Sequence, residues 1–250
     1  GLMSLTGEPE GMPMKVGVAL VDVMTGLYSC NAVLAALMAR HQTNEGQHID
    51  IALLDVQVAT LANQGMNYLA TGENPQRLGN GHPNIVPYQT FATQDGSIIL
   101  AVGNDNQFAK FCQIAQCSKI AEDPWFATNE QRVINRDKLI PILACKLASH
   151  TSQWWINKLE DISVPCGPVN TLEQVFNHPQ IKHREMVRQV ANQQGELIDT
   201  IASPINLSAT PLQYNSASPD LGQHSHQVLS KMLNYSEEHI SKLFTNATVG

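Results

Sequence analysis

The stretch from residue 16 to residue 41 constrains this chain more than any other, because one acidic residue interrupts a long apolar sequence. Residues 16–21 carry no charge, and Asp22 is the only charged residue between Lys15 and Arg40. Downstream, apolar residues recur at helical spacing, at Leu27, Cys30, Leu34 and Leu37. The pattern predicts a short strand and then a helix that is buried, because it is apolar on most of its faces. Arg40 and His41 suit the negative end of the helix dipole, so the helix is expected to end there.

Asp22 falls where this helix is expected to begin, which leaves two interpretations of its carboxylate open. In the first, it caps the helix by accepting hydrogen bonds from free backbone N–H groups. In the second, it is a nucleophile that the positive end of the helix dipole keeps ionised, able to attack a carbonyl carbon. The two are compatible, since the same N–H groups stabilise either a carboxylate or an oxyanion.

The next segments continue an alternation of strand and helix. Residues 48–52 alternate between polar and apolar side chains, as a short strand does. Residues 54–68 place apolar side chains on one helical stripe, and Gly72 ends it. Strand, helix, strand and helix in this order predict a parallel α/β layer with right-handed crossovers.

Residues 73–84 have the composition of a loop, with four residues that interrupt regular structure: Pro75, Gly79, Gly81 and Pro83. Such a stretch is typical of simple interdomain chain. It is also compatible with a mobile flap that covers a site. The residues alone leave both interpretations open.

The remaining chain predicts two hairpins and several helices. The predicted elements are strands 88–93 and 97–102, helices 105–117 and 129–150, strands 187–191 and 197–201, and helices 223–235 and 236–244. Asn104 and Asp105 can cap the first of these helices, and Ser236 can cap the last. Pro141 lies inside the second and should kink it or split it in two.

Charge and cysteine content exclude several classes of function. The formal net charge of −7 argues against nucleic-acid binding, which needs clustered Lys and Arg to neutralise phosphates. Five cysteines without metal-ligand or redox spacing indicate reduced thiols in a cytoplasmic protein. No metal site is expected. No membrane partner is expected either, because no apolar run of about 18 residues is found.

Lys15 to Asp22, followed by Thr25-Gly26, resembles the segment around the nucleophilic aspartate of the family III CoA-transferases, which include the α-methylacyl-CoA racemases. Three further segments match the family in the same order: residues 46–55, 87–105 and 221–224. No single segment is specific, but the ordered set is, and it spans nearly the whole chain. The closest likeness is to members that move CoA between succinate and glutarate.

The resemblance implies part of a large Rossmann-like parallel α/β domain and a small α/β domain, joined by two linkers, in an interlocked homodimer. The implied boundaries are a large-domain segment at 1–70, a linker or flap at 71–84, the small domain at 85–164, a second linker at 165–203, and a C-terminal return to the large domain at 204–250. The dinucleotide-binding-like region that precedes the aspartate in the family has no counterpart here and is expected to be missing.

The resemblance also implies roles for individual residues. Asp22 would accept the acyl group of an acyl-CoA covalently, with coenzyme A as carrier, no metal, and a carboxylic acid, such as a short dicarboxylate, as acceptor. A glycine-rich flap would close over it, here Gly79, Asn80, Gly81 and His82. In racemase-like members a carboxylate near the place of Asp105 assists proton transfer. The candidates to pair with a substrate's second carboxylate are Arg77, Arg132 and Arg136, although solvation at the surface is the ordinary state of such side chains.

Two alternative functions stay open. The first is an acyl-CoA racemase of the same superfamily, in which an Asp and a His move the α-proton. The second is a folded fragment without catalytic activity. The net charge of −7 does not match the polyanion CoA, so the basic surface that binds CoA is expected in the missing region.

Overall fold

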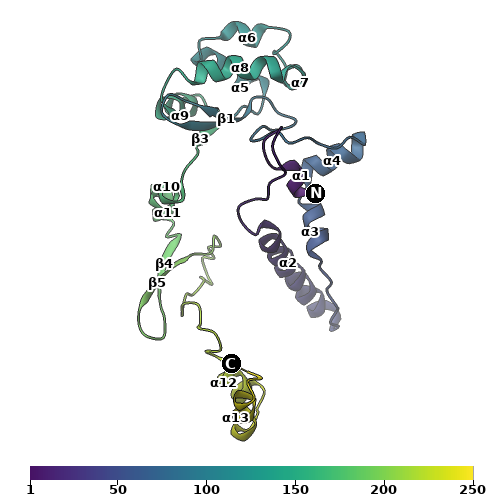
Figure 1. Cartoon of the computed structure of the whole chain (residues 1–250), viewed down its shortest axis with the longest axis vertical. Coiled ribbons are helices and arrows are strands. Elements are labelled where there is room, and N and C mark those ends of the chain that lie inside the picture. The colour runs from purple at the N-terminus through teal and green to yellow at the C-terminus, as the bar shows by residue number, and fades with distance from the viewer. Residues whose placement is uncertain (250) are drawn as a thin grey trace. The chain divides into compact units, whose positions relative to one another are not determined.

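The computed structural model describes residues 1–249 and divides the chain into two compact units, Gly1–Val169 and Asn170–Gly250 (Figure 1). Each unit combines helices with one small sheet, which confirms the mixed α/β class. The boundary between the units falls inside the linker expected at residues 165–203. The five-part division itself stays a prediction.

The first unit begins with four helices: α1 (Leu2–Leu5), α2 (Leu20–Thr43), α3 (Leu53–Ala59) and α4 (Ala62–Thr71). The strands predicted at 16–21 and 48–52 are wrong, because both segments are irregular up to the helix that follows each. A strand is stable only when a neighbouring strand takes up its N–H and C=O groups. Within residues 1–249 neither segment pairs with a strand, and every strand pair is antiparallel.

Helix α2 ends as its sequence predicts, but it is not buried. Arg40 and His41 lie in its last turn, and Asn44 closes it with a left-handed φ of 58° and an N–H bond to the Arg40 carbonyl at 2.8 Å. The expectation of burial is wrong, because none of its residues is buried and Leu27, Leu34 and Leu37 are exposed.

The expectation that no apolar run is long enough to cross a membrane is wrong for helix α2. Among the described residues it is the one helix that meets this test by length and composition. Core helices of soluble proteins meet the same test, so length and composition do not identify what covers α2.

A hydrophobic core lies in the second half of the first unit. A three-stranded antiparallel sheet, ordered β1 (Tyr88–Ala92), β2 (Ser97–Ala101) and β3 (Cys166–Pro168), packs with α5 (Asp105–Ile114), α6 (Ser118–Glu122), α7 (Asn129–Ile134), α8 (Arg136–Leu147) and α9 (Ser152–Asp161). Ile98 and Leu100 point from the central strand into this core. The longer helices α5, α8 and α9 add buried apolar residues three or four positions apart, such as Leu139, Leu143 and Leu147.

The helix predicted at 129–150 is split, but at Asn135 and not at Pro141. The Asn135 side-chain amide donates to the carbonyls of Gln131, at 2.9 Å, and Trp125, at 3.2 Å. Asparagine competes in this way with the helical backbone, and α7 ends there. Pro141 is instead accommodated inside α8.

The second unit holds short elements joined by irregular chain. They are α10 (Leu172–Asn177), α11 (Pro179–His183), β4 (Val187–Ala191), β5 (Leu197–Ile201), α12 (Ser225–Gln227), the π-helical turn η1 (Val228–Met232) and α13 (Glu237–Thr245). The antiparallel pairing of β4 with β5 confirms the predicted hairpin. Ser236 caps α13 as expected, while the helix predicted at 223–235 is shorter and includes the π turn.

Candidate active site

Asp22 lies in the first turn of α2, two residues inside the helix. Ala19 occupies the N-cap position, and no side chain caps this end. The capping interpretation of Asp22 is therefore wrong. Its side chain is exposed, and within residues 1–249 no hydrogen bond or ion pair engages its carboxylate. The positive end of a 24-residue helix lies beside it and favours a negative charge.

A hollow of about 330 Å³ opens at Asp22. Its lining combines Leu2 and Met3 of α1, the irregular chain from Lys15 to Ala19, the first residues of α2, and Gln57 of α3. Lys15 and Asp22 are the charged residues of this lining. Ligand pockets of proteins range from roughly 300 to 1,000 Å³, so the hollow is large enough for a small ligand.

Local hydrogen bonds explain how this hollow forms. Leu20 donates its N–H to the Val18 carbonyl at 2.8 Å, which turns the chain sharply into α2. One turn further on, the Thr25 hydroxyl donates to the Val21 carbonyl at 2.7 Å. The Thr25 hydroxyl is therefore engaged by the backbone of α2, and Thr25 is not among the residues that line the hollow.

Residues 79–81 do not line the hollow at Asp22. Gly79 adopts φ +56° and donates its N–H to the Gly7 carbonyl at 3.0 Å. This φ favours glycine, and a Cβ atom at Gly79 would lie 3.0 Å from Glu8 Oε2, the end of a flexible side chain that would have to move aside. Asn80 Nδ2 donates to Thr90 Oγ1 at 3.0 Å. The loop thus lies beside the chain that leads from α1 to Lys15.

His82 is held by its backbone and by its ring. Its N–H donates to the Tyr88 carbonyl at 2.8 Å, and its ring stacks on the Tyr88 ring at 5.2 Å. Its Nδ1 accepts the N–H of Asn84 at 3.1 Å, so the ring is neutral in this arrangement. Burial and then the charge of Arg136 hold the pKa of His82 below its usual range.

Acidification is expected to loosen this segment. Since the pKa of His82 is lower in the folded chain, the stability that the neutral ring contributes is present above about pH 6.5 and is lost as pH falls through the folded value. Protonation also removes the acceptor for the Asn84 N–H. Thermal melting from about pH 7 to about pH 5 should show a smaller loss for His82→Gln than for the wild type. Equal losses would contradict this role.

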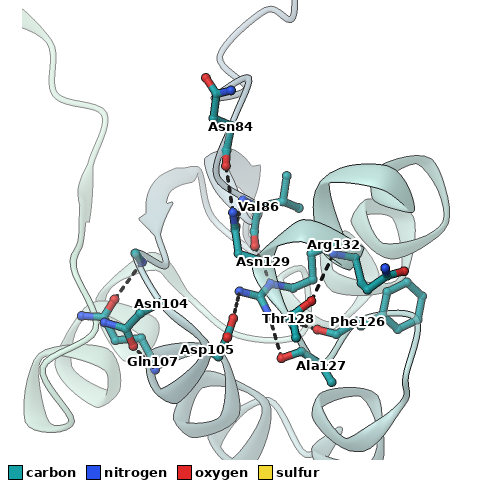
Figure 2. A network of polar contacts seen from close by, with 12 residues as sticks. Asn84, Val86, Asn104, Asp105, Gln107, Phe126, Ala127, Thr128, Asn129 and Arg132 are labelled. Atoms are coloured by element: carbon teal, nitrogen blue, oxygen red, sulfur yellow. Dashed lines mark hydrogen bonds and ion pairs between the residues drawn. The ribbon is translucent and has the colours of Figure 1, made fainter. Parts of the chain in front are cut away.

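Asp105 lies in the first turn of α5, next to the residue that caps that helix. Asn104 Oδ1 accepts the Gln107 N–H at 2.9 Å, which confirms the predicted cap at this place. The Asp105 carboxylate accepts a hydrogen bond from Arg132 at 2.8 Å, as Figure 2 shows. Arg132 is 0% exposed, so the expectation that it is solvated at the surface is wrong. A role of Asp105 in proton transfer stays a prediction.

The other two candidate arginines are engaged by backbone carbonyls. Arg77 donates to Glu8 at 3.2 Å and to Gly11 at 2.6 Å. Arg136 donates to the carbonyls of His82 at 3.3 Å and Pro83 at 2.6 Å. Lys15 is the cation that shares the hollow with Asp22. Sequence reasoning missed Lys15, although it is the charged residue that opens the motif around Asp22.

Among the described residues, neither metal-ion chemistry nor a cysteine nucleophile finds support. No group of three or more His, Cys, Asp or Glu side chains is arranged to hold a metal ion in residues 1–249. Cys166 lies on β3, where burial and the charge of Glu160 raise its pKa to about 11. It is therefore protonated at neutral pH and is a poor nucleophile.

Comparison with known proteins adds to this geometry. The sequence profile of CoA-transferase family III matches residues 1–225. The chain is 46% identical over 232 residues to a succinate–glutarate CoA-transferase of Agrobacterium fabrum, covering 93% of this chain and 58% of that protein. It is 35% identical over 249 residues to the human succinyl-CoA:glutarate CoA-transferase, covering 100% of this chain and 57% of that protein.

Solved structures agree with the sequence matches. A CaiB/BaiF family protein from Brucella suis is similar with a TM-score of 0.73 and 44% identity, over 93% of this chain and 60% of that chain. Rv3272 of Mycobacterium tuberculosis has a TM-score of 0.77 and 26% identity, over 90% of this chain and 60% of that one. The chain thus spans less than two thirds of the length of these proteins.

Proposed function

Because this chain belongs to CoA-transferase family III, we propose that the protein moves CoA from an acyl-CoA to a short dicarboxylate, with Asp22 as nucleophile. The observation that carries the proposal is the exposed Asp22 carboxylate, which lines an apolar hollow and has no partner among residues 1–249. A carboxylate that neither caps a helix nor forms an ion pair is available to attack a thioester. The relatives named succinate–glutarate CoA-transferases support a dicarboxylate acceptor.

The proposed reaction is a series of acyl exchanges. One Asp22 oxygen attacks the thioester carbonyl carbon, and the C–S bond breaks to give CoA thiolate and a mixed anhydride. The thiolate attacks the Asp22 carbonyl carbon, which releases the donor acid as its carboxylate and leaves an aspartyl-CoA thioester. The acceptor carboxylate then attacks this thioester, and the two exchanges run in reverse to give the new acyl-CoA and free Asp22. No water is consumed, and covalent catalysis divides the transfer into small steps.

The surroundings of Asp22 suit these steps. Each attack places negative charge on a carbonyl oxygen, and the first N–H groups of α2 together with its dipole favour negative charge at this place. Lys15 adds a positive charge to the same hollow. In the proposal, Lys15 pairs with the second carboxylate of a dicarboxylate substrate, since the guanidinium groups of Arg77, Arg132 and Arg136 already bind protein carbonyls.

Water must be kept from the anhydride, because hydrolysis would waste the activated acyl group. The hollow at Asp22 is open in this structure, and the loop from Gly79 to His82 is proposed to cover it during turnover. The two glycines support this role because they give the loop conformational freedom, and the bond between Gly79 and Gly7 shows that the loop lies beside the chain that enters the hollow.

We further propose that the protein is a homodimer in the cytoplasm. Coenzyme A is its acyl carrier in this proposal. Helix α2 exposes apolar side chains along its length, and apolar patches of this kind mark protein interfaces. The family membership supports a protein surface, and not a lipid, as the cover of α2.

A donor–acceptor screen on the whole protein tests this function. With succinyl-CoA as donor and glutarate as acceptor, we expect glutaryl-CoA and free succinate in equal amounts. The variant Lys15→Met should raise the KM for glutarate about tenfold or more, with a smaller effect on a monocarboxylate of similar size. Exchange of the α-proton in deuterated buffer, without CoA transfer to any acid, would show a racemase and overturn the proposal.

A further inference from the structure

The irregular chain at residues 82–86 is held by side chains from one pair of helices. Arg136 donates to the carbonyls of His82 and Pro83, at 3.3 and 2.6 Å. Asn129 Nδ2 donates to the Asn84 carbonyl at 2.8 Å. Arg132 Nε donates to the Val86 carbonyl at 2.7 Å. Asn129, Arg132 and Arg136 together form a clamp on residues 82–86, and Figure 2 shows Asn129 and Arg132.

Asn129 and Arg132 are each held by several hydrogen bonds. Asn129 uses both ends of its amide, since its Oδ1 also accepts the Val86 N–H at 3.1 Å. Arg132 is fully buried, and its remaining N–H groups bind Phe126, Ala127 and Asp105. Hydrogen bonds from a guanidinium are charge-assisted and about twice as strong as neutral ones.

The clamp follows from spacing along the sequence. Asn129 and Arg132 are three positions apart on α7, so they lie on one side of that helix. Arg136 is the first residue of α8 and reaches His82 and Pro83 from there. Helix α4 holds the same segment from elsewhere, because Asn63 and Asn67 each donate to Asn84 Oδ1 at 3.2 Å. Residues 82–86 are thus bound by three helices.

The glycine-containing part of the loop, residues 79–81, is held differently. Gly79 donates one backbone bond to Gly7, and Gly81 donates one to Leu78, at 2.8 Å within the loop itself. The Asn80 amide has one side-chain partner, Thr90. No arginine binds a carbonyl of residues 79–81 in the described structure. Two glycines also give this part more conformational freedom than its neighbours.

We propose that Asn129, Arg132 and Arg136 are positioning residues that fix the C-terminal hinge of the loop at His82. Opening and closing over Asp22 is thereby confined to residues 79–81. This inference rests on the proposed function, because it assumes that the loop covers Asp22 in turnover. The clamp gives the moving part a fixed base and a reproducible closed position, which limits the entry of water.

Hydrogen exchange on the whole protein measures the hinge directly. In the wild type, exchange should be fast in peptides from residues 79–81 and at least about tenfold slower in residues 82–88. Asn129→Leu and Arg136→Gln should extend fast exchange into residues 82–88. The matched controls Asn157→Leu and Arg184→Gln alter exposed side chains outside the clamp, and they should leave the pattern unchanged. A folded Asn129→Leu or Arg136→Gln protein with wild-type exchange would overturn the inference.

Steady-state kinetics distinguish a positioning role of the clamp residues from a merely structural role. Both clamp variants should lower kcat about tenfold with little change in the KM for acyl-CoA, and should raise the ratio of acyl-CoA hydrolysis to transfer. Arg136→Lys keeps a donor and should recover part of kcat relative to Arg136→Gln. If hydrogen exchange in residues 82–88 became faster while the ratio of hydrolysis to transfer stayed unchanged, the clamp would have a structural role alone and the inference would be rejected. A wild type without transfer activity would reject the proposed function, while the exchange pattern still decides the hinge.

Discussion

Replacing Asp22 with alanine is expected to reduce CoA transfer by roughly 10⁴-fold or more in the whole protein, because the variant lacks the carboxylate that forms the covalent acyl-enzyme. The fold should survive the change. Asp22 is exposed and has no bonded partner among residues 1–249, so its loss costs about 0.3–1 kcal/mol of helix-dipole energy at most. Steady-state transfer rates and a thermal melt of the same sample measure both effects.

The chemistry of the intermediate offers an independent check on Asp22. Hydroxylamine added during turnover should convert the aspartyl thioester to a hydroxamate, which mass spectrometry locates on the peptide that contains Asp22. Asp55→Asn is the matched control, because Asp55 is also an exposed carboxylate in the first turn of a helix and lies outside the hollow. Wild-type turnover by Asp22→Ala, or a label on another residue, would end the nucleophile proposal.

Replacing Arg132 with leucine is expected to destabilise the folded chain by about 3–5 kcal/mol. The substitution leaves the carbonyls of Val86, Phe126 and Ala127 without the donor that binds them now. It also removes the guanidinium that lies 4.4 Å from the centre of the Phe108 ring. Urea denaturation, read as the change in midpoint at constant slope, measures this loss.

The ion pair between Arg132 and Asp105 should account for little of the stability that Arg132→Leu loses. Asp105 is 53% exposed, so solvent screens its attraction to Arg132, and Asp105→Asn should cost less than about 1 kcal/mol. Arg184→Leu is the surface control, with an expected change within about 0.5 kcal/mol. If Arg132→Leu cost no more than Asp105→Asn, the carbonyl bonds would not be what makes Arg132 important.

Local sequence rules predicted the elements whose hydrogen bonds are local. The hairpin of β4 and β5, the Asn104 cap of α5, the Ser236 cap of α13 and the C-terminal end of α2 all depend on residues within a few positions. The segments 16–21 and 48–52 have strand-like sequences, but a strand also needs a partner, and partners are set by tertiary structure. The capping interpretation of Asp22 was wrong by three residues, since Ala19 occupies the N-cap position of α2.

For the candidate site, the sequence by itself determined one thing: an acidic residue at the start of a long apolar helix, in a motif of family III. Only the tertiary structure showed that Lys15 shares the hollow of Asp22 and that Arg132 is buried while it holds a loop 46 residues earlier in the chain. The physical reason is that a helix start depends on neighbouring residues, whereas burial and carbonyl pairing depend on segments far apart in the chain. No pattern within a short window records those long-range contacts.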